Sequence, residues 1–437
     1  MRGISHLNAS IPRACCKNDR KMHTVERGFG SASPIEGEVD RGVIDPMRHG
    51  DSLKRLPLIL LLLLCTASGG CKEGPWVLWK SYSTHFIDDH GRVVDPQGGN
   101  RTPSEGQGYA LFFALVDNDR VHFDRLLAWT QANLAGGNMG TRLPGWLWGR
   151  AQDGQWKLLD PQPSSDGDCW IAYSLIEAGR LWHNPAYTTL GRQMMAMIAK
   201  QEVAELPGFG IMLMPGPTAL FVHNQTWMVN PSYVPLFLFD RFQEVDPSGP
   251  WGAIAMNIPS LLRQSVRHGF VMDWMEYVPG DGFYPVAGPL ALQPGKSQVA
   301  ALGSYDAIRT YLWAGMLDSA GRTRTDLVGT MSGMASYLAN HGAPPEKVSS
   351  DGVPLEQDGP VGFSAALLPY LRALPDMSKT SAQQRVRMGE QLDSSTGLYG
   401  KDPAYYDQNL VLFATGFLNS RFRFGGHGEL SVEWSRE

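Results

Sequence analysis

The sequence predicts an all-α fold, an (α/α)6 barrel with six inner and six outer helices. Six segments share one pattern, in which a cluster of Gly, Pro, Ser, Asn or Asp precedes a polar or acidic residue and a long apolar run. Successive segments start roughly 45 to 75 residues apart, the length of a helical hairpin and a loop, which indicates a repeated supersecondary unit. The six inner segments begin near Glu105, Asp166, Asn230, Ser304, Gly359 and Tyr405.

The outer helices are predicted from amphipathic stretches, most of which lie between the apolar runs. They cover residues 76–86, 120–134, 187–203, 251–268, 325–340 and 381–392. Buried and half-exposed helices that alternate along the chain close into a ring, with the apolar set inside. Strand patterns are scarce, and only residues 208–213 and 282–286 are expected to form small hairpins on the rim. Together these elements make one domain, residues 72–437.

Two segments precede this domain. Residues 1–46 lack hydrophobic periodicity and are expected to be an upstream extension outside the mature protein. Residues 47–71 are expected to be an export signal, because two basic residues precede an apolar run, residues 56–64, that is too short to span a bilayer. The protein is therefore expected in the periplasm or secreted, with no transmembrane segment in the mature domain. A lipid anchor at Cys71 is the alternative, although Ser68 stands where a leucine is usual.

Composition excludes several classes of function. The net charge of -5 arises from mixed acids and bases without a basic block, which argues against a nucleic-acid partner. The chain lacks a Walker-type phosphate loop, a Gly-x-Ser-x-Gly elbow and a His-Glu-x-x-His motif, and its histidines are scattered singly, so no metal or cofactor is expected. Without the leader, Cys71 and Cys169 are too few for a disulfide framework. Thirteen tryptophans, many beside Gly, Pro or Asn, suit stacking on sugar faces, although most tryptophans simply pack.

The inner helices of such a ring run parallel, so their polar N-terminal ends gather on one face, which is the expected active site. Tyr305 and three tryptophans near these ends are expected to complete a sugar-binding cleft. The candidate residues on the helix ends are Glu105, Asp166, Asn230, Tyr233, Asp306, Arg309, Tyr406 and Asp407, and the tryptophans are Trp146, Trp148 and Trp227.

Each acid taken singly also fits a structural role at a helix N-terminus. Ser104 and Gln107 match a capping box, and Ser304 is placed to cap its helix with Asp306 in the first turn. Joint placement favours function, because helix capping does not require an arginine and several aromatic residues alongside.

Two carboxyl groups at helix mouths suggest hydrolysis of a glycosidic bond, in which one acid is protonated and the other ionised. Glu105 is followed by glycines and an apolar run, and a desolvated pocket there raises a carboxyl pKa. Asp306 stands three residues before Arg309, a cation that favours ionisation. Glu105 is therefore the expected general acid and Asp306 the expected general base.

Several motifs resemble those of the bacterial glycoside hydrolase family 8 endoglucanases. Residues 165–178, ending at Trp182, are similar to the family signature, departing where Ser164 replaces an expected alanine. Residues 104–109, 230–233 and 304–309 resemble the family's general-acid, cleft and base motifs. The resemblance covers about residues 74 to 425. It implies an (α/α)6 barrel and inverting hydrolysis, with Asp166 contacting the sugar at the cleavage point.

Within the family, residues 143–149 and 311–316 look most like the periplasmic endo-β-1,4-glucanase (cellulase) associated with bacterial cellulose synthase. This resemblance implies β-1,4-glucan chains as substrate, a link to cellulose biosynthesis and the synthase complex as a partner. The family also acts on xylan, chitosan and mixed-linkage glucan, so these substrates remain alternatives. A non-catalytic glucan-binding component of a cellulose export complex is the alternative from a different class.

Overall fold

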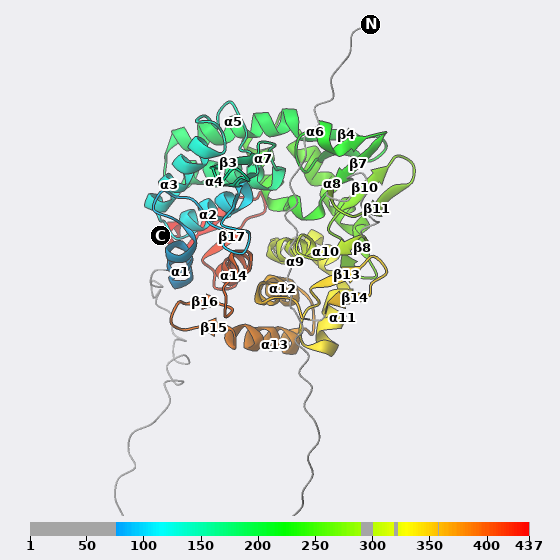
Figure 1. The fold of residues 1–437 in the computed structure, drawn as a ribbon. Coiled ribbons are helices and arrows are strands. Elements are labelled where there is room, and N and C mark those ends of the chain that lie inside the picture. Colours follow the sequence, from blue (N-terminus) through cyan, green and yellow to red (C-terminus); the bar gives the residue numbers. More distant parts are fainter. Residues whose placement is uncertain (1–75, 290–299, 319–321, 357, 437) are drawn as a thin grey trace, which may run out of the picture. The chain divides into compact units, whose positions relative to one another are not determined.

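Inner and outer helices alternate along the chain in the computed structural model, which describes residues 76–289, 300–318, 322–356 and 358–436 (Figure 1). The inner helices are α2 (Ser104–Val116), α4 (Ser165–Leu181), α7 (Leu236–Val245), α9 (Ala307–Met316), α12 (Val361–Ala373) and α14 (Tyr405–Leu418), of which all but α7 are mostly buried. The outer helices are α1 (Val77–Phe86), α3 (Arg120–Asn133), α5 (Pro185–Gln201), α8 (Trp251–Gln264), α10 (Arg322–Thr330) with α11 (Ser332–His341), and α13 (Ser378–Gly389). The predicted (α/α)6 barrel is confirmed.

The sequence explains which helices lie inside. Every residue of α2 except Glu105 is buried, as are all ten residues of α9, which matches the apolar runs that follow the polar first turn of each helix. In α5 the buried residues are Tyr187, Gly191, Met194, Met195 and Ile198, one stripe at helical spacing. Figure 1 shows α9, α12 and α14 in the interior, with α1, α13 and α11 around them.

Aromatic side chains fill the space between the inner helices. The Phe413 ring of α14 lies 5.0 Å from Trp170 of α4, 5.0 Å from Trp313 of α9 and 5.1 Å from Tyr109 of α2, measured between ring centroids. Such edge-to-face contacts are worth about 0.5–1.5 kcal/mol each beyond the area they bury. The barrel is therefore a packed core with a rigid floor, and Tyr109 extends its hydroxyl from that floor toward the mouth.

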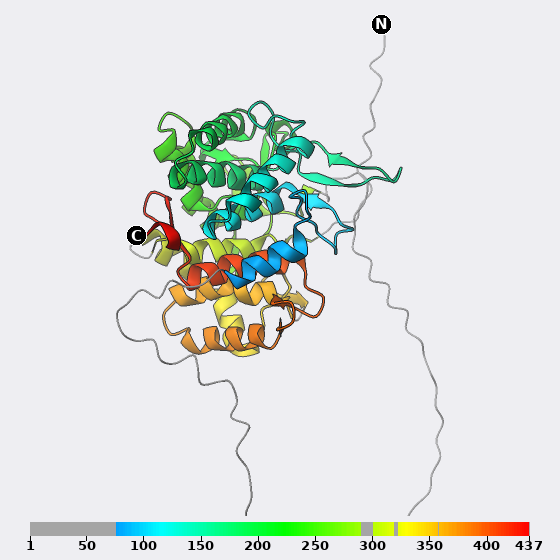
Figure 2. The same ribbon diagram turned by 90° about the vertical axis from the view of Figure 1, so that its left-hand side faces the viewer.

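The rim carries more strands than the sequence predicts. The two expected hairpins form, as β4 (Val203–Leu206) with β5 (Gly210–Leu213) and β10 (Met275–Val278) with β11 (Gly282–Pro285). The expectation that no others form is wrong, because loops that meet at the rim also pair. The further strands are β1 (Thr102–Pro103), β2 (Leu147–Arg150) and β3 (Trp156–Asp160) in one sheet; β6 (Val222–His223) and β7 (Thr226–Val229) beside β10; β12 (Leu302–Gly303), β13 (Lys347–Ser349) and β14 (Pro354–Glu356); and the pairs β8 (Val266–Arg267) with β9 (Phe270–Val271), β15 (Leu392–Asp393) with β16 (Leu398–Tyr399), and β17 (Phe422–Phe424) with β18 (Leu430–Val432). In Figure 2 the β2–β3 hairpin projects from the helical body.

Two helices differ from the predicted pattern. The third inner segment starts as a 3-10 turn, Pro231–Tyr233, and becomes α7 only after Pro235. The predicted outer helix at residues 325–340 is broken into α10 and α11, because the Gly333 amide donates to Gly269 O at 3.1 Å instead of to its own helix. A short four-residue helix, α6 (Thr218–Phe221), lies in the loop before β6.

The predicted upstream extension and export signal, residues 1–46 and 47–71, lie outside the described residues, as does Cys71. In the part of the chain that the structure describes, no helix is both long and apolar enough to cross a membrane.

Candidate active site

Arg309 in the first turn of α9 joins the three acidic residues that the sequence singles out. Its Nη1 donates to Glu105 Oε2 at 2.8 Å and to Asp166 Oδ2 at 3.1 Å, and its Nη2 donates to Asp306 Oδ1 at 2.6 Å. The side chains of Arg309 and Asp166 are 2% and 5% exposed, whereas those of Glu105 and Asp306 are 21% and 28% exposed. The two predicted catalytic acids are thus the ones that a ligand can reach.

Uncharged side chains also hydrogen-bond to the Arg309 guanidinium or pack against it. Arg309 Nη1 also donates to the Tyr109 hydroxyl at 3.1 Å, and Nη2 donates to Ser232 Oγ at 3.0 Å. Asn230 Oδ1 accepts from the amide and the hydroxyl of Ser232, so Asn230 orients Ser232. The guanidinium carbon lies 5.4 Å from the ring centre of Tyr233. The predicted residues Asn230 and Tyr233 therefore belong to the same cluster.

A glycine brings Glu105 and Asp166 together. A Cβ atom on Gly167 would lie 2.5 Å from Ser104 Oγ and 2.8 Å from the Glu105 amide nitrogen, distances that real Cβ atoms do not adopt. Gly167 immediately follows Asp166 and permits α4 to touch the start of α2. The glycine thereby sets how closely the two carboxylates approach.

We expect Gly167→Ala to displace Glu105 and to lower kcat by about 100-fold, because catalysis tolerates little misplacement of a reacting group. The added methyl should also cost about 1–3 kcal/mol of folding free energy through overpacking. Gly179→Ala is the matched control: it lies in the same helix, where a Cβ would meet Thr188 Oγ1 at 2.1 Å, but far from the carboxylates. Melting curves and kcat of both variants test this, and an equal loss of kcat in the control would contradict it.

Three carboxyl groups contact one guanidinium. If all three were ionised, this buried site would carry a net negative charge, which burial disfavours. Burial raises the pKa of Glu105 to about 8, although Arg309 opposes this, and repulsion from Asp166 adds to it. Burial also raises the pKa of Asp306, against the lowering effects of Arg309 and of hydrogen bonding from Asn230 and Trp274. Arg309 contacts both acids, so the reasoning that it favours ionisation of Asp306 alone does not hold.

The capping roles considered for these segments are not realised. Ser104 Oγ has no hydrogen-bond partner, and the Gln107 side chain accepts from the Val93 amide at 2.7 Å and donates to Thr130 Oγ1 at 2.8 Å. Ser304 Oγ donates to Asp273, which is outside its own helix. The capping-box interpretation of Ser104 and Gln107 is therefore wrong.

Tyr305 and Tyr406 lie together at the mouth of the barrel. Their ring centroids are 5.8 Å apart, and the Tyr406 hydroxyl donates to the Tyr305 carbonyl. Tyr305 is 41% exposed and directly precedes Asp306, so its ring is available to a ligand.

Asp407 differs from its predicted place beside the carboxylates. It is 8% exposed, and its Oδ1 would lie 2.5 Å from a Cβ on Gly362, so it packs against the start of α12. Burial raises the pKa of Asp407 to about 7. Asp407 therefore joins α14 to α12, and the structure does not bring it to Arg309.

The three candidate tryptophans occupy different environments. Trp148 lies on β2, opposite a bulge at Leu159 of β3. It stacks on Trp156 of β3 with ring centroids 5.1 Å apart and meets Trp129 of α3 edge-on at 5.4 Å. Trp227 lies on β7 and is 8% exposed. Both side chains are thus on strands and pack against protein.

Trp146 keeps a position next to the acid. It directly precedes β2 and is half-buried, and its carbonyl accepts from the Ser104 amide at 2.8 Å. Ser104 directly precedes Glu105. Trp146 is thus hydrogen-bonded to the residue directly before Glu105, the expected general acid.

Sequence reasoning missed several residues that shape this site. Tyr109 and Ser232 hold Arg309, but neither has a local signal beyond lying in the motifs at residues 104–109 and 230–233. Asp273, next to Trp274, follows an apolar stretch without any motif. Within the described ranges, no group of three or more His, Cys, Asp and Glu side chains is arranged to hold a metal ion.

A second pair of buried acids, Asp168 and Glu202, lies outside the Arg309 cluster. Both are fully buried. Burial raises the pKa of Glu202 to about 8, and burial together with repulsion from Glu202 raises the pKa of Asp168. Two such carboxyls share a proton more readily than they ionise together.

Comparison with known proteins identifies a matching family and related sequences and structures. A family model described as glycosyl hydrolases family 8 matches residues 54–419. The chain is 44% identical over 389 residues to an endoglucanase of Xanthomonas axonopodis pv. citri, covering 88% of this chain and 96% of that protein. It is 38% identical over 383 residues to an endoglucanase of Escherichia coli O157:H7, covering 87% and 97%. The crystal structure of endo-1,4-D-glucanase from Vibrio fischeri ES114 superposes with a TM-score of 0.72 at 36% identity, covering 82% of this chain and 99% of that one.

Proposed function

The chain belongs to glycosyl hydrolase family 8, and on that premise we propose that it is an endoglucanase that cleaves β-1,4-glucan with inversion at the anomeric carbon. The observation that carries the proposal is the Arg309 cluster, in which two reachable carboxyls contact different nitrogens of one guanidinium. An acid with a pKa of about 8 beside a second carboxylate matches the division of roles that this hydrolysis needs.

In the proposed reaction, Glu105 donates its proton to the glycosidic oxygen as the bond from that oxygen to the anomeric carbon breaks. A water molecule attacks the anomeric carbon from the opposite face, and Asp306 accepts the proton that this water releases. Asp166 is proposed to contact the sugar at the cleavage point through the small exposed part of its side chain, with its carboxylate held by Arg309 and the Gly167 amide. Each proton is accounted for: one leaves Glu105 and one arrives at Asp306.

Soluble carboxymethylcellulose tests the activity, because endo-cleavage lowers its viscosity before many reducing ends appear. The same assay on xylan, chitosan and mixed-linkage glucan tests the alternative substrates. If one of these three polysaccharides is cleaved faster, it replaces β-1,4-glucan as the proposed substrate. If no reducing ends are released from any polysaccharide, a non-catalytic glucan-binding protein is favoured. The paired acids argue against binding alone, since binding requires no second carboxylate at the reaction centre.

We expect activity to depend on pH through both acids. Glu105 must be protonated, so kcat/KM of the free enzyme should fall as pH rises through about 8. Asp306 must be ionised, so kcat/KM should also fall as pH drops through the pKa of Asp306, which burial raises above its usual value. A kcat/KM profile on a cello-oligosaccharide checks both limbs. A plateau that continues well beyond pH 9 would contradict the assignment of Glu105.

We also propose that the enzyme acts outside the cytoplasm, on cellulose chains as they are secreted, in association with a cellulose synthase complex. The basic and apolar pattern of residues 54–64 supports export, and the resemblance at residues 143–149 and 311–316 supports the link to cellulose synthesis. Mass spectrometry of the protein recovered from the producing cells tests export, since a signal-cleaved chain lacks residues 1 to about 70 and a lipidated chain carries added mass at Cys71. A strain without the gene should secrete cellulose of altered chain length, and unchanged cellulose would remove the biosynthetic link.

A further inference from the structure

Asp273 holds the turn that carries the proposed general base. Asp273 Oδ1 accepts hydrogen bonds from the Ser304 amide and the Ala307 amide, both at 2.7 Å, and Oδ2 accepts from Ser304 Oγ at 2.5 Å. These three bonds join one carboxylate to both ends of the turn Ser304–Ala307. Asp306 lies inside that turn, one residue before α9 begins.

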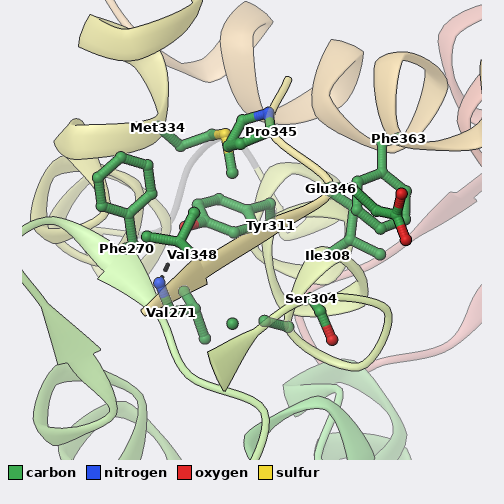
Figure 3. A pocket seen from close by; sticks show the side chains of 12 residues that line it. Phe270, Val271, Ser304, Ile308, Tyr311, Met334, Pro345, Glu346, Val348 and Phe363 are labelled. Atoms are coloured by element: carbon green, nitrogen blue, oxygen red, sulfur yellow. Dashed lines mark hydrogen bonds between the residues drawn. The ribbon is translucent and has the colours of Figure 1, made fainter. Parts of the chain in front are cut away.

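Asp273 lies in the short segment between β9 and β10, and this segment is fixed by residues on either side of the turn. The Asp273 amide donates to Leu302 O at 2.7 Å, and the Val271 amide donates to the Tyr311 hydroxyl at 2.9 Å, the dashed line in Figure 3. A Cβ on Gly303 would lie 2.0 Å from Val271 O, so β9 and β12, which leads into the turn, touch through their backbones. Asp273 is therefore anchored independently of the turn that it binds.

Packing alone does not fix the turn on its other side. Figure 3 shows a cavity behind Ser304 that is lined by Val271, Ile308, Tyr311 and Phe363 among others. It has room for about one water molecule, about 10 Å³. Since side chains leave space behind the turn, the hydrogen bonds that Asp273 accepts, together with the one from the Tyr406 hydroxyl to Tyr305 O, define its position toward the cleft.

We propose that Asp273 is the positioning residue for Asp306. It has no place in proton transfer; it holds the backbone on both sides of Asp306 so that the carboxylate reaches Arg309 and faces the attacking water. Without it, the Ala307 amide, one of the first N–H groups of α9, loses its acceptor. The inference rests on the proposed role of Asp306 as general base.

The test compares Asp273→Ala with Asp273→Asn in the full chain. Alanine removes all three acceptors, and we expect kcat on cellopentaose to fall by about 100-fold while KM stays within about three-fold, because a misplaced base affects the transition state more than binding. Asparagine keeps an acceptor for both amides and offers its NH₂ to Ser304 Oγ, so it should restore kcat to within about ten-fold of the wild type. Ser304→Ala, which removes one bond, should fall between the wild type and Asp273→Ala.

Asp119→Ala is the matched structural control. Asp119 also accepts three hydrogen bonds, from the His122 amide, His122 Nδ1 and Trp79 Nε1, but it caps α3 away from the site. This variant should melt at a lower temperature with kcat unchanged. If Asp273→Ala fails to fold, Asp273→Asn and Ser304→Ala still decide the question through kcat and the pH profile.

The pH profile separates positioning from general destabilisation. Burial raises the pKa of Asp273 to about 7 and repulsion from Asp306 adds to it, so Asp273 is mostly protonated below that pH. Asp273→Asn should therefore keep the acidic limb of kcat/KM close to that of the wild type, whereas displacement of Asp306 in Asp273→Ala should move it. The other charged groups that face this region remain in place, namely Arg309, Asp166, Glu105 and Glu346. An Asp273→Ala enzyme with wild-type kcat, or an Asp273→Asn enzyme as impaired in kcat as Asp273→Ala, would overturn the inference. A wild-type enzyme that is inactive on every glucan, or an active Asp306→Asn variant, would instead overturn the proposed function.

Discussion

Glu105→Gln should lose about 10²–10⁴-fold in kcat on carboxymethylcellulose while it folds and binds glucan normally, because the amide keeps the shape of the side chain but has no proton to donate. The amide oxygen still accepts from Arg309, and Arg309 retains its bonds to Asp166 and Asp306. Initial rates together with binding of a cello-oligosaccharide by calorimetry check the result. Activity above about a tenth of the wild type would show that another group is the acid.

The same variant should be more stable than the wild type at neutral pH. The pKa of Glu105 is about 8 in the folded chain and lies near its ordinary value in the unfolded chain, so the folded state binds the proton more tightly. The stability associated with this proton is complete below the ordinary glutamate pKa and is lost as pH rises through about 8. Glutamine does not titrate, so the gain in melting temperature should be larger at pH 8 than at pH 5.

Glu202→Gln provides the control for this stability effect. Burial raises the pKa of Glu202 to about 8 as well, but Glu202 makes no contact with Arg309. It should show a similar gain in melting temperature at pH 8 and retain activity. If Glu105→Gln loses activity and Glu202→Gln does not, the loss reflects the role of Glu105 in catalysis and not a change in stability from neutralising a buried acid. A drop in melting temperature for Glu105→Gln would mean that Arg309 depends on the charge of Glu105.

Local sequence pattern predicts the ring of helices well. Five of the six inner helices start within three residues of the predicted position, because glycine and polar residues end a loop and a long apolar run forces burial. The exception is α7, which starts six residues late, after a 3-10 turn and Pro235. Local pattern does not predict the short rim strands, because β1 and β2 are brief and come from segments that only the fold brings together. The helix break at Gly333 likewise arises from a backbone contact with a distant turn.

Local sequence pattern also predicts part of the site, whereas contacts between residues far apart in the sequence determine the rest. The motifs place Glu105, Asp306 and Arg309 at helix mouths, but the bond from Arg309 to Glu105 spans 204 residues, and no local pattern predicts it. Trp148 packs on Trp156 of β3 and Trp129 of α3, contacts that no local pattern predicts. Asp273 could not be predicted because its partners are backbone amides about 30 residues further along the chain, which carry no sequence signal.

Hydrolysis of a β-glucan should release the α-anomer first. An inverting enzyme keeps its two carboxyls about 6.5–9.5 Å apart to admit a water, whereas a retaining enzyme holds them about 5–5.5 Å apart. Here Glu105 and Asp306 do not bond to each other: the guanidinium of Arg309 and two hydrogen bonds of 2.8 Å and 2.6 Å lie between them. Arg309 also holds Asp306 Oδ1 as a charged partner, which favours the ionised form of Asp306.

Proton NMR of fresh hydrolysate distinguishes the two outcomes, because mutarotation produces the β-anomer only later. Cellopentaose digested with enough enzyme to finish within minutes should show the α-anomeric signal rising first, and Glu105→Gln digests should show neither signal on that timescale. Initial accumulation of the β-anomer would mean retention, in which case Asp306 or Asp166 would have to attack the sugar directly. Arg309 would then have to release that carboxylate during every turnover, at the cost of leaving a buried cation with one partner fewer.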